Sequence, residues 1–380
     1  MTIGRMILGV VLVLALVVVA RSGHEQSVYP SYYPHELEIA AVAPERAAEL
    51  LRAGKLHAYV GKAPSLAIGD GIGAVESLGA FVVIRLNPDS PRARDEATAC
   101  ATAGALARDM AQRGSGFVAH PYPVTPWHGD YLHHADRAEA ARQRILGSDS
   151  SATLGPSDLK VRAASVLARG LTRPEWLSDG EPWDAAVEEA SAADLVARET
   201  VTLNGWLGPR WTRSGWFHAY RLLASSIAGG AQAAQLAADV ERLQNAAYAG
   251  AAERINLERD LVRSLLSGCR ALVAGYTVKR EYFNASSSAG IENISFDALE
   301  GLGSPMFLRT VKLKDFPWNG WLQLGVGQPP AAAWNPIGGF SDDFGRLMWF
   351  AVADPAAIPS PYEQAWTLNR FSDVEASPWR

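Results

Sequence analysis

The chain has 380 residues, of which 48% are hydrophobic and 20% are charged, values typical of folded globular proteins. A net charge of −5, with no cluster of Lys and Arg, argues against nucleic acid as a partner. Two cysteines and no C-x-x-C-H motif exclude a disulfide-rich scaffold and a covalently attached c-type haem.

An apolar run of fifteen residues, 6–20, lies between two arginines near the N-terminus. A membrane-crossing helix needs about 17–20 such residues, and Ile3 and Gly4 can extend the run to that length. The small residues 18–20 equally suit the cleavage site of a secretory signal peptide. Residues 1–21 are therefore expected to be a single-pass transmembrane anchor or a signal peptide. Either alternative predicts a periplasmic or cell-surface protein, anchored to the inner membrane or exported across it.

Residues 22–36 contain prolines and tyrosines and are expected to form an extended tether. The next part, residues 37–135, alternates strand and helix signals. Strands are expected at residues 37–42, 56–60, 80–86 and 117–119, and helices at 44–53 and 91–112. This order matches the split β-α-β-β-α-β arrangement and predicts a small α/β domain that ends in a His-rich loop.

Residues 136–274 are expected to be a mostly helical region, with the strongest helical pattern over 231–274. Gly250 interrupts that pattern. Apolar residues from Leu236 to Leu266 recur at spacings that place them on one helix face. The opposite face is expected to be solvated, and its charged residues are Glu241, Arg242, Glu253, Arg254, Glu258, Arg259 and Arg263.

Residues 275–353 are expected to be β-rich, and residues 354–380 to form a Pro-rich tail that crosses the surface. The expected strands of this part are 276–283, 306–313, 321–326 and 347–352. The sequence therefore predicts an α+β fold: an N-terminal anchor or signal peptide, a small α/β layer, a helical middle and β-rich C-terminal segments.

The two cysteines, Cys100 and Cys269, both fall in expected helices that are rich in alanine and leucine. In an oxidising compartment they can pair, whereas buried free thiols are also common in such helices. The sequence leaves both alternatives open.

Four of the eight histidines fall within fifteen residues: His120, His128, His133 and His134. Asp130 and Asp136 lie within or beside this cluster. Neutral imidazole is the commonest side-chain metal ligand, and carboxylates act as further ligands or hold the second ring nitrogen. A helix that begins near Asp130 would place Asp130 and His134 on one face. These six residues are thus candidate ligands for Zn or Cu, or for the iron of a b-type haem.

The same cluster also has a purely structural interpretation. The spacing matches neither the H-E-x-x-H motif of zinc peptidases nor a zinc finger. In this alternative Asp130 caps the helix, while His120 and His128 bond backbone or tyrosine partners within a rigid aromatic loop. A third interpretation is general acid–base work by His and Asp in a cleft.

Twelve tryptophans form the second unusual feature of the composition. Trp206, Trp211 and Trp216 recur every five residues, and Trp318 and Trp321 share one short segment. Exposed tryptophans stack on sugar rings or anchor interfaces, so these five are candidate binding residues. The alternative is that they fill the core.

Three functions remain compatible with the sequence. The first is an extracytoplasmic, membrane-tethered binding or accessory protein of an envelope complex, with a metal or haem at the His cluster. The second is an envelope hydrolase that acts on a glycan or another polymer, for which a Trp-lined cleft with two facing acids is the expected mark. The third is a structural subunit of a membrane complex. No G-x-S-x-G elbow is present, so whether the protein is an enzyme stays open.

Overall fold

The computed structural model describes residues 34–62, 66–114, 116–147, 159–197, 209–227, 229–315, 320–329, 343–352, 357–361 and 365–369. The expected anchor or signal peptide (1–21) and most of the tether (22–36) lie outside these ranges, as does most of the C-terminal tail. Within the described residues, no helix combines the length and the apolar character that a membrane crossing requires.

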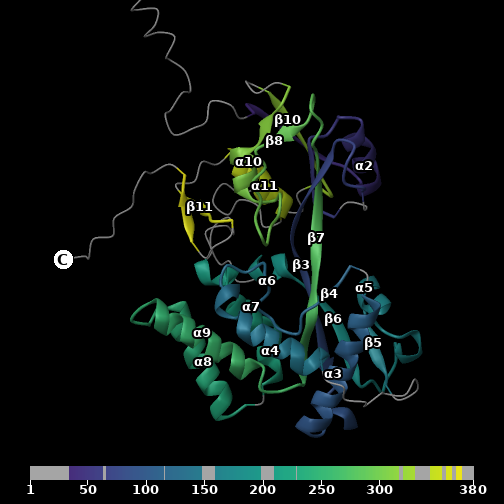
Figure 1. The fold of residues 1–380 in the computed structure, drawn as a ribbon, viewed down its shortest axis with the longest axis vertical. Helices are drawn as coiled ribbons and strands as arrows, with labels where there is room; N and C mark the ends of the chain where they lie inside the picture. The colour runs from purple at the N-terminus through teal and green to yellow at the C-terminus, as the bar shows by residue number, and fades with distance from the viewer. Residues whose placement is uncertain are drawn as a thin grey trace, which may run out of the picture.

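A mixed sheet organises the described part of the chain (Figure 1). Its strands, in pairing order, are β1 (Glu36–Ala41), β10 (Trp321–Val326), β2 (Ala58–Val60), β7 (Ala271–Asn284), β3 (Ile72–Leu86), β6 (Ala185–Ser191) and β5 (Val161–Ala163), while β4 (Val118–Ala119) also pairs with β7. The pairs β1–β10, β10–β2 and β5–β6 are parallel, and the other pairs are antiparallel. Two small antiparallel pairs are β8 (Ile291–Glu292) with β9 (Lys312–Leu313), and β11 (Ala357–Pro359) with β12 (Trp366–Leu368).

The long strands β3 and β7 run through the molecule and connect its two ends (Figure 1). The expected strand 80–86 forms the C-terminal half of β3. Its side chains alternate between the two sides of the sheet: Phe81 and Val83 join one core cluster, while Val82 and Ile84 join another. Because both faces are covered, the strand reads as a continuous apolar run.

Helices lie against both faces of the sheet (Figure 1). They are α2 (Pro44–Arg52), α3 (Glu96–Arg113), α4 (Ala135–Leu146), α5 (Val166–Leu171), α6 (Ala192–Ala197), α7 (Gly215–Leu223), α8 (Ala231–Gln244), α9 (Ala251–Leu265), α10 (Pro305–Thr310) and α11 (Asp343–Val352). The largest apolar core forms where α7, α8 and α9 pack against β3 and β7, and it contains Trp216, Phe217 and Leu261. This core supports the candidate site described below.

Local signals explain the elements that the sequence predicts correctly. Pro44 stands in the first turn of α2, and the Asp95 carboxylate accepts a hydrogen bond from the Thr98 amide at 2.9 Å to cap α3. The strands β1, β2, β4 and β10 and the long helix after residue 91 are confirmed, apart from shifts of a few residues at their ends.

The expected β-α-β-β-α-β order is confirmed by β1, α2, β2, β3, α3 and β4, but these strands do not form a sheet of their own. In the sheet, β10 lies between β1 and β2 and is parallel to both strands. Strands from residues 37–135 and 275–353 therefore pair directly in one sheet. How the chain divides into domains stays a prediction.

Two expected strands near the C-terminus are helices instead. Pro305–Thr310 forms α10 in place of the first part of the expected strand 306–313, since the Ser304 hydroxyl accepts from the Met306 amide and Pro305 occupies the first turn. The end of that expected strand, Lys312–Leu313, is the strand β9. The expected strand 347–352 lies in α11. Short apolar runs fit a buried helix as well as a buried strand, so composition alone misassigned both.

The expected helical pattern over 231–274 is divided into α8, a turn, α9 and the first residues of β7. Gly250 stands directly before α9, which agrees with its expected role as an interruption. The strands β5 and β6 were missed within the expected helical region. Glu188 of β6 pairs with Arg85 of β3 at 2.7 Å across the strands, rather than lying on a helix.

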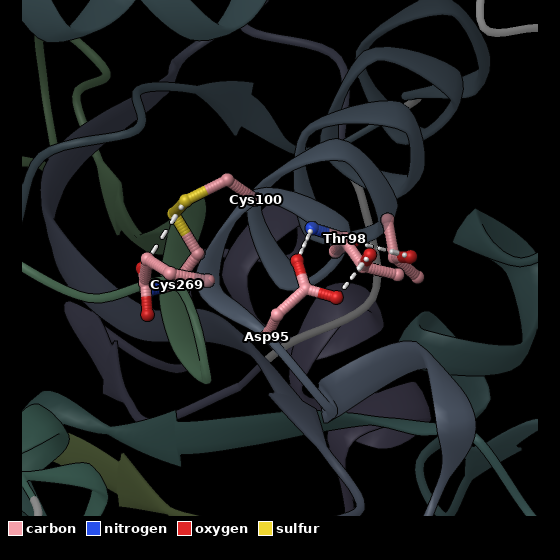
Figure 2. The surroundings of a disulfide bond; sticks show 6 residues. Asp95, Thr98, Cys100 and Cys269 are labelled. Carbon is pink, nitrogen blue, oxygen red and sulfur yellow. Dashed lines mark hydrogen bonds between the residues drawn. A yellow bond between two sulfur atoms is a disulfide. The ribbon is translucent and has the colours of Figure 1, made fainter.

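Cys100 and Cys269 form a disulfide, which decides between the two alternatives that the sequence leaves open. Cys100 lies in α3, close to the capped start of the helix, as Figure 2 shows, and Cys269 lies in the turn between α9 and β7, not in a helix. The bond thus ties α3 to the start of β7. Glu96 accepts a hydrogen bond from the Cys269 amide at 2.8 Å and holds the same turn.

Replacing both cysteines by alanine is expected to lower the free energy of unfolding by about 2–4 kcal/mol, because the cross-link closes a long loop and restricts the unfolded chain. The two residues are 169 positions apart. Urea unfolding of the double variant and of the parent protein measures the difference. Dithiothreitol should bring the parent to the variant's midpoint and leave the variant unchanged; equal midpoints without reductant would contradict the prediction.

Candidate metal and ligand site

The His-rich loop leads from β4 to α4 and lies against α7 and α9. It brings three groups together: one potential ligand atom from each of Asp130, His134 and Glu258 lies within 4.8 Å of the others. All three side chains are buried, with exposed fractions of 3%, 0% and 1%. Two of the three come from the predicted loop, and the third comes from α9.

Asp130 is held at the N-terminus of α7. The amide of Gly215 donates to both carboxylate oxygens of Asp130, at 3.2 and 3.1 Å. A helix N-terminus favours a negative charge through its free amides and its dipole. Gly215 is required for close packing here, because a Cβ would lie 2.4 Å from a methyl carbon of Val124.

His134 presents one ring nitrogen without a partner. Its Nδ1 lies 2.9 Å from the Tyr122 hydroxyl, while its buried Nε2 has no hydrogen-bond partner among the described residues. Burial, followed by the nearby guanidinium groups of Arg259 and Arg137, lowers the pKa of His134 to about 4. The imidazole is therefore neutral at pH 7, which is the form that binds a metal.

Glu258 has a similar unsatisfied atom. Its Oε1 accepts from Arg254 at 2.7 Å, whereas its buried Oε2 has no hydrogen-bond partner among the described residues. Burial, followed by the charge of Asp130, raises the pKa of Glu258 to about 7. A buried carboxylate is stable when it is protonated, paired or bound to a metal ion, and here one oxygen of Glu258 lies within 4.8 Å of potential ligand atoms of His134 and Asp130.

A cavity of about 610 Å³ lies against this cluster. Asp130 and Glu258 contribute to its wall. The remaining side chains that matter for a ligand are Trp211, Trp216, Tyr248 and Arg254. Trp211 and Trp216 pack on each other with ring centroids 6.1 Å apart, and Trp216 is only 1% exposed. This volume and mixed lining are typical of small-molecule sites.

His128 has both ring nitrogens engaged within the protein. Its Nδ1 accepts from the Thr125 amide at 2.9 Å, so its Nε2 carries the proton and donates to His218 Nδ1 at 2.9 Å. His218 Nε2 then donates to the Thr212 carbonyl at 3.1 Å. The chain of bonds is complete with both rings neutral, which gives this pair a structural role in the core.

The other predicted ligands lie apart from the cluster. His120 donates to the Val124 carbonyl at 3.0 Å, as the structural interpretation of the loop expects. His133 is exposed at the cavity edge. Asp136 accepts two bonds of 2.7 Å from Arg259, and these bonds hold the pKa of Asp136 below its usual range. Among the described residues, no group of three potential ligands contains His120, His128, His133 or Asp136. Their assignment as metal ligands stays a prediction.

The five candidate tryptophans are separated by the fold. Trp211 and Trp216 line the cavity, whereas Trp321 is 61% exposed on β10 at the other end of the molecule (Figure 1). Trp206 and Trp318 lie outside the described residues.

Glu258 is the site residue that sequence reasoning missed. Its charge pattern on α9 predicts a solvated position, but the side chain is only 1% exposed and contributes to the cavity wall. The available signal was its helical spacing: Glu258 lies one turn before Val262 and close to Leu261, which belong to the apolar face.

The chain matches no protein-family model and no curated protein sequence. Among solved structures, it is similar to OppA of Haemophilus influenzae in complex with RPPGFSPFR (11% identity, TM-score 0.41, 71% of this chain and 56% of that chain). It is also similar to the periplasmic oligopeptide-binding protein of Thermotoga maritima (10%, 0.42, 72% and 62%). A third is the ABC transporter-associated periplasmic binding protein DppA of Helicobacter pylori in complex with the peptide STSA (12%, 0.41, 72% and 55%).

The chain spans little more than half the length of these proteins. At these identities and TM-scores, the similarity carries no argument about function. The described fold itself is α+β, with a mixed sheet and helices on both faces, and no family is assigned to the chain.

Proposed function

We propose that this protein is an extracytoplasmic binding protein that holds one divalent transition-metal ion between Asp130, His134 and Glu258. The observation that carries the proposal is the pair of buried, unpartnered atoms, His134 Nε2 and Glu258 Oε2, beside the Asp130 carboxylate. Buried polar atoms without partners are rare in native proteins, and an ion that binds both would satisfy them.

The donor set favours zinc. One imidazole and two carboxylates form a mixed nitrogen and oxygen set that suits Zn²⁺, with Cu²⁺ as the alternative. Their charges sum to −2 and balance the ion. A b-type haem is less suited, because its axial imidazole would need a broad apolar slot and His134 instead faces two carboxylates.

Tyr122 would hold the His134 imidazole in place through a hydrogen bond to its other ring nitrogen. A metal at Nε2 leaves the proton on Nδ1, which then donates to the Tyr122 oxygen 2.9 Å away. Burial raises the pKa of Tyr122, so its hydroxyl stays neutral and accepts this bond. Such outer contacts fix the tautomer and orientation of a ligand imidazole.

The extracytoplasmic location is supported by the disulfide between Cys100 and Cys269, because such bonds persist in oxidising compartments. Tethering by residues 1–21 to the inner membrane, and work within an envelope complex, are part of the proposal and depend on segments outside the described residues.

The test is calorimetric titration of the full chain, stripped with a chelator, with zinc chloride or copper sulfate. We expect one ion per chain, and a loss of affinity of roughly 100-fold or more in His134→Ala and in Glu258→Gln. His35→Ala, an exposed histidine directly before β1 and outside the cavity lining, is the control and should bind as the parent does. The absence of binding, or equal binding by His134→Ala, would refute the metal site.

The hydrolase is the second candidate, and one observation favours it. The cavity is lined by two tryptophans and by two acids, Asp130 and Glu258, and two carboxyl groups are what glycan cleavage uses. A glutamic acid with a pKa of about 7 is suited to act as a general acid. Release of reducing sugar from a soluble glycan by the metal-free protein, abolished in Glu258→Gln, would favour this function over metal binding. The third hypothesis, a structural subunit, stays a prediction.

A further inference from the structure

The cavity beside the proposed metal site has a lining that selects one class of ligand. This inference rests on the proposed function, because it assigns a role to the metal's remaining coordination position. Three protein ligands leave at least one position of a tetrahedral zinc ion for a further ligand. Asp130 and Glu258 belong both to the cluster and to the cavity wall, so a molecule in the cavity lies next to the ion.

The charge of the loaded site favours an anion. Asp130 and Glu258 balance a divalent ion, and they are the acidic side chains among the described residues that line the cavity. Arg254 also lines it, with its side chain 27% exposed and paired to Glu258. The loaded site therefore carries about one net positive charge, which a single carboxylate would neutralise.

Three aromatic side chains, Trp211, Trp216 and Tyr248, also line the cavity. Trp211 and Tyr248 are both half-buried and both line the cavity, so each offers part of its ring to a ligand. Trp216 and Phe217 pack behind Trp211, with the Trp211 and Phe217 ring centroids 4.9 Å apart, and hold its ring in place. A flat ring on the ligand would gain stacking or edge contacts with these side chains.

We infer that the site binds a small aryl monocarboxylate. Its carboxylate ligates the metal ion and pairs with Arg254, and its ring lies against Trp211 and Tyr248. The two ends of the ligand are thus recognised by different groups, which allows each contact to be tested by itself.

The test uses phenylacetate and its uncharged analogue phenylacetamide, titrated by calorimetry into the full chain with and without zinc chloride. Phenylacetate is expected to bind the zinc-loaded protein at least tenfold more tightly than the metal-free protein. The affinity for phenylacetamide is expected to be the same with and without zinc. Arg254→Gln should weaken phenylacetate binding about tenfold while zinc alone still binds. Trp211→Ala should weaken it several-fold. Arg263→Gln, on the same helix with a side chain 69% exposed, is the control and should change nothing.

The outcomes separate the two proposals. If zinc binds but phenylacetate does not, or the amide binds equally well, the ligand class is wrong and the metal site stands. If Trp211→Ala binds phenylacetate as the parent does, the ring contact is wrong. If zinc itself does not bind, the proposed function fails and this inference fails with it.

Discussion

Replacing Asp297 by alanine is expected to lower the free energy of unfolding by about 3 kcal/mol, because it removes the buried partner of a buried guanidinium group and leaves only the partly exposed Glu300, 3.5 Å away, among the ion pairs described for it. The Asp297 side chain is fully buried and forms an ion pair with Arg213, whose side chain is 12% exposed. Burial alone would lower the pKa of Arg213, but the charges of Asp297 and Glu300 raise it, so the arginine stays charged. Asp297 also accepts from the amides of Leu299 and Glu300 at 2.7 and 3.0 Å.

The loss should extend to the cavity. Arg213 ends the short 3₁₀ turn Arg210–Arg213, which contains Trp211 of the cavity wall and Thr212, the carbonyl partner of His218. Without Asp297, this turn loses its anchor to the segment after β8. We therefore expect the variant to bind a cavity ligand more weakly as well as to unfold more easily.

Two further variants, measured by urea unfolding, test whether the loss of stability comes from the buried ion pair. Asp297→Asn keeps an oxygen for the two backbone amides but removes the charge, so it should retain part of the stability. Glu49→Ala breaks the exposed pair of Arg46 and Glu49, whose side chains are 62% and 63% exposed, and should change stability by less than about 1 kcal/mol. Asp297→Ala with the stability of the parent would show that the buried pair is not needed.

Acidification of the metal-free protein from pH 7 to pH 4 is expected to remove on the order of 5 kcal/mol of stability. Burial lowers the pKa of His134 to about 4, and burial likewise lowers the pKa of His218 to about 4 and that of His128 well below its usual value. In the unfolded chain these groups titrate near 6.5. The unfolded state therefore binds more protons between pH 6.5 and 4, so stability is lost as the pH falls through this window.

Glu258 acts in the opposite direction. Its pKa in the folded protein is about 7, above the ordinary value near 4.5, so the folded state takes up a proton first as the pH falls. This uptake offsets part of the loss caused by the histidines between pH 7 and 4.5. In Glu258→Gln the offset is absent, and stability should fall more steeply between pH 7 and 5 than in the parent.

Urea unfolding at several pH values, with chelator present throughout, measures both proteins. A stability that stays constant from pH 7 to pH 4, or identical slopes for the parent and Glu258→Gln, would contradict the assigned protonation states. The chain of bonds from Thr125 through His128 and His218 to Thr212 gives the physical reason for the histidine effect. Protonation of either ring would place two donors against each other.

The sequence by itself determined the elements that local chemistry specifies. The apolar run 80–86 predicted the central strand, Pro44 marked the start of α2, and the spacing of Asp130 and His134 predicted that these two groups lie together. In each case the signal lies within a few residues of the element: a fixed φ, or a period that matches a helix or a strand.

Only the tertiary structure decided the features that join distant segments. These are the position of β10 between β1 and β2, the pairing of Cys100 with Cys269, the bond between His128 and His218, and the contribution of Glu258 to the cluster. The physical reason is common to all of them. Each depends on which segments pack together, and packing depends on the whole core, so no local pattern at Glu258 or His218 records which partner it meets.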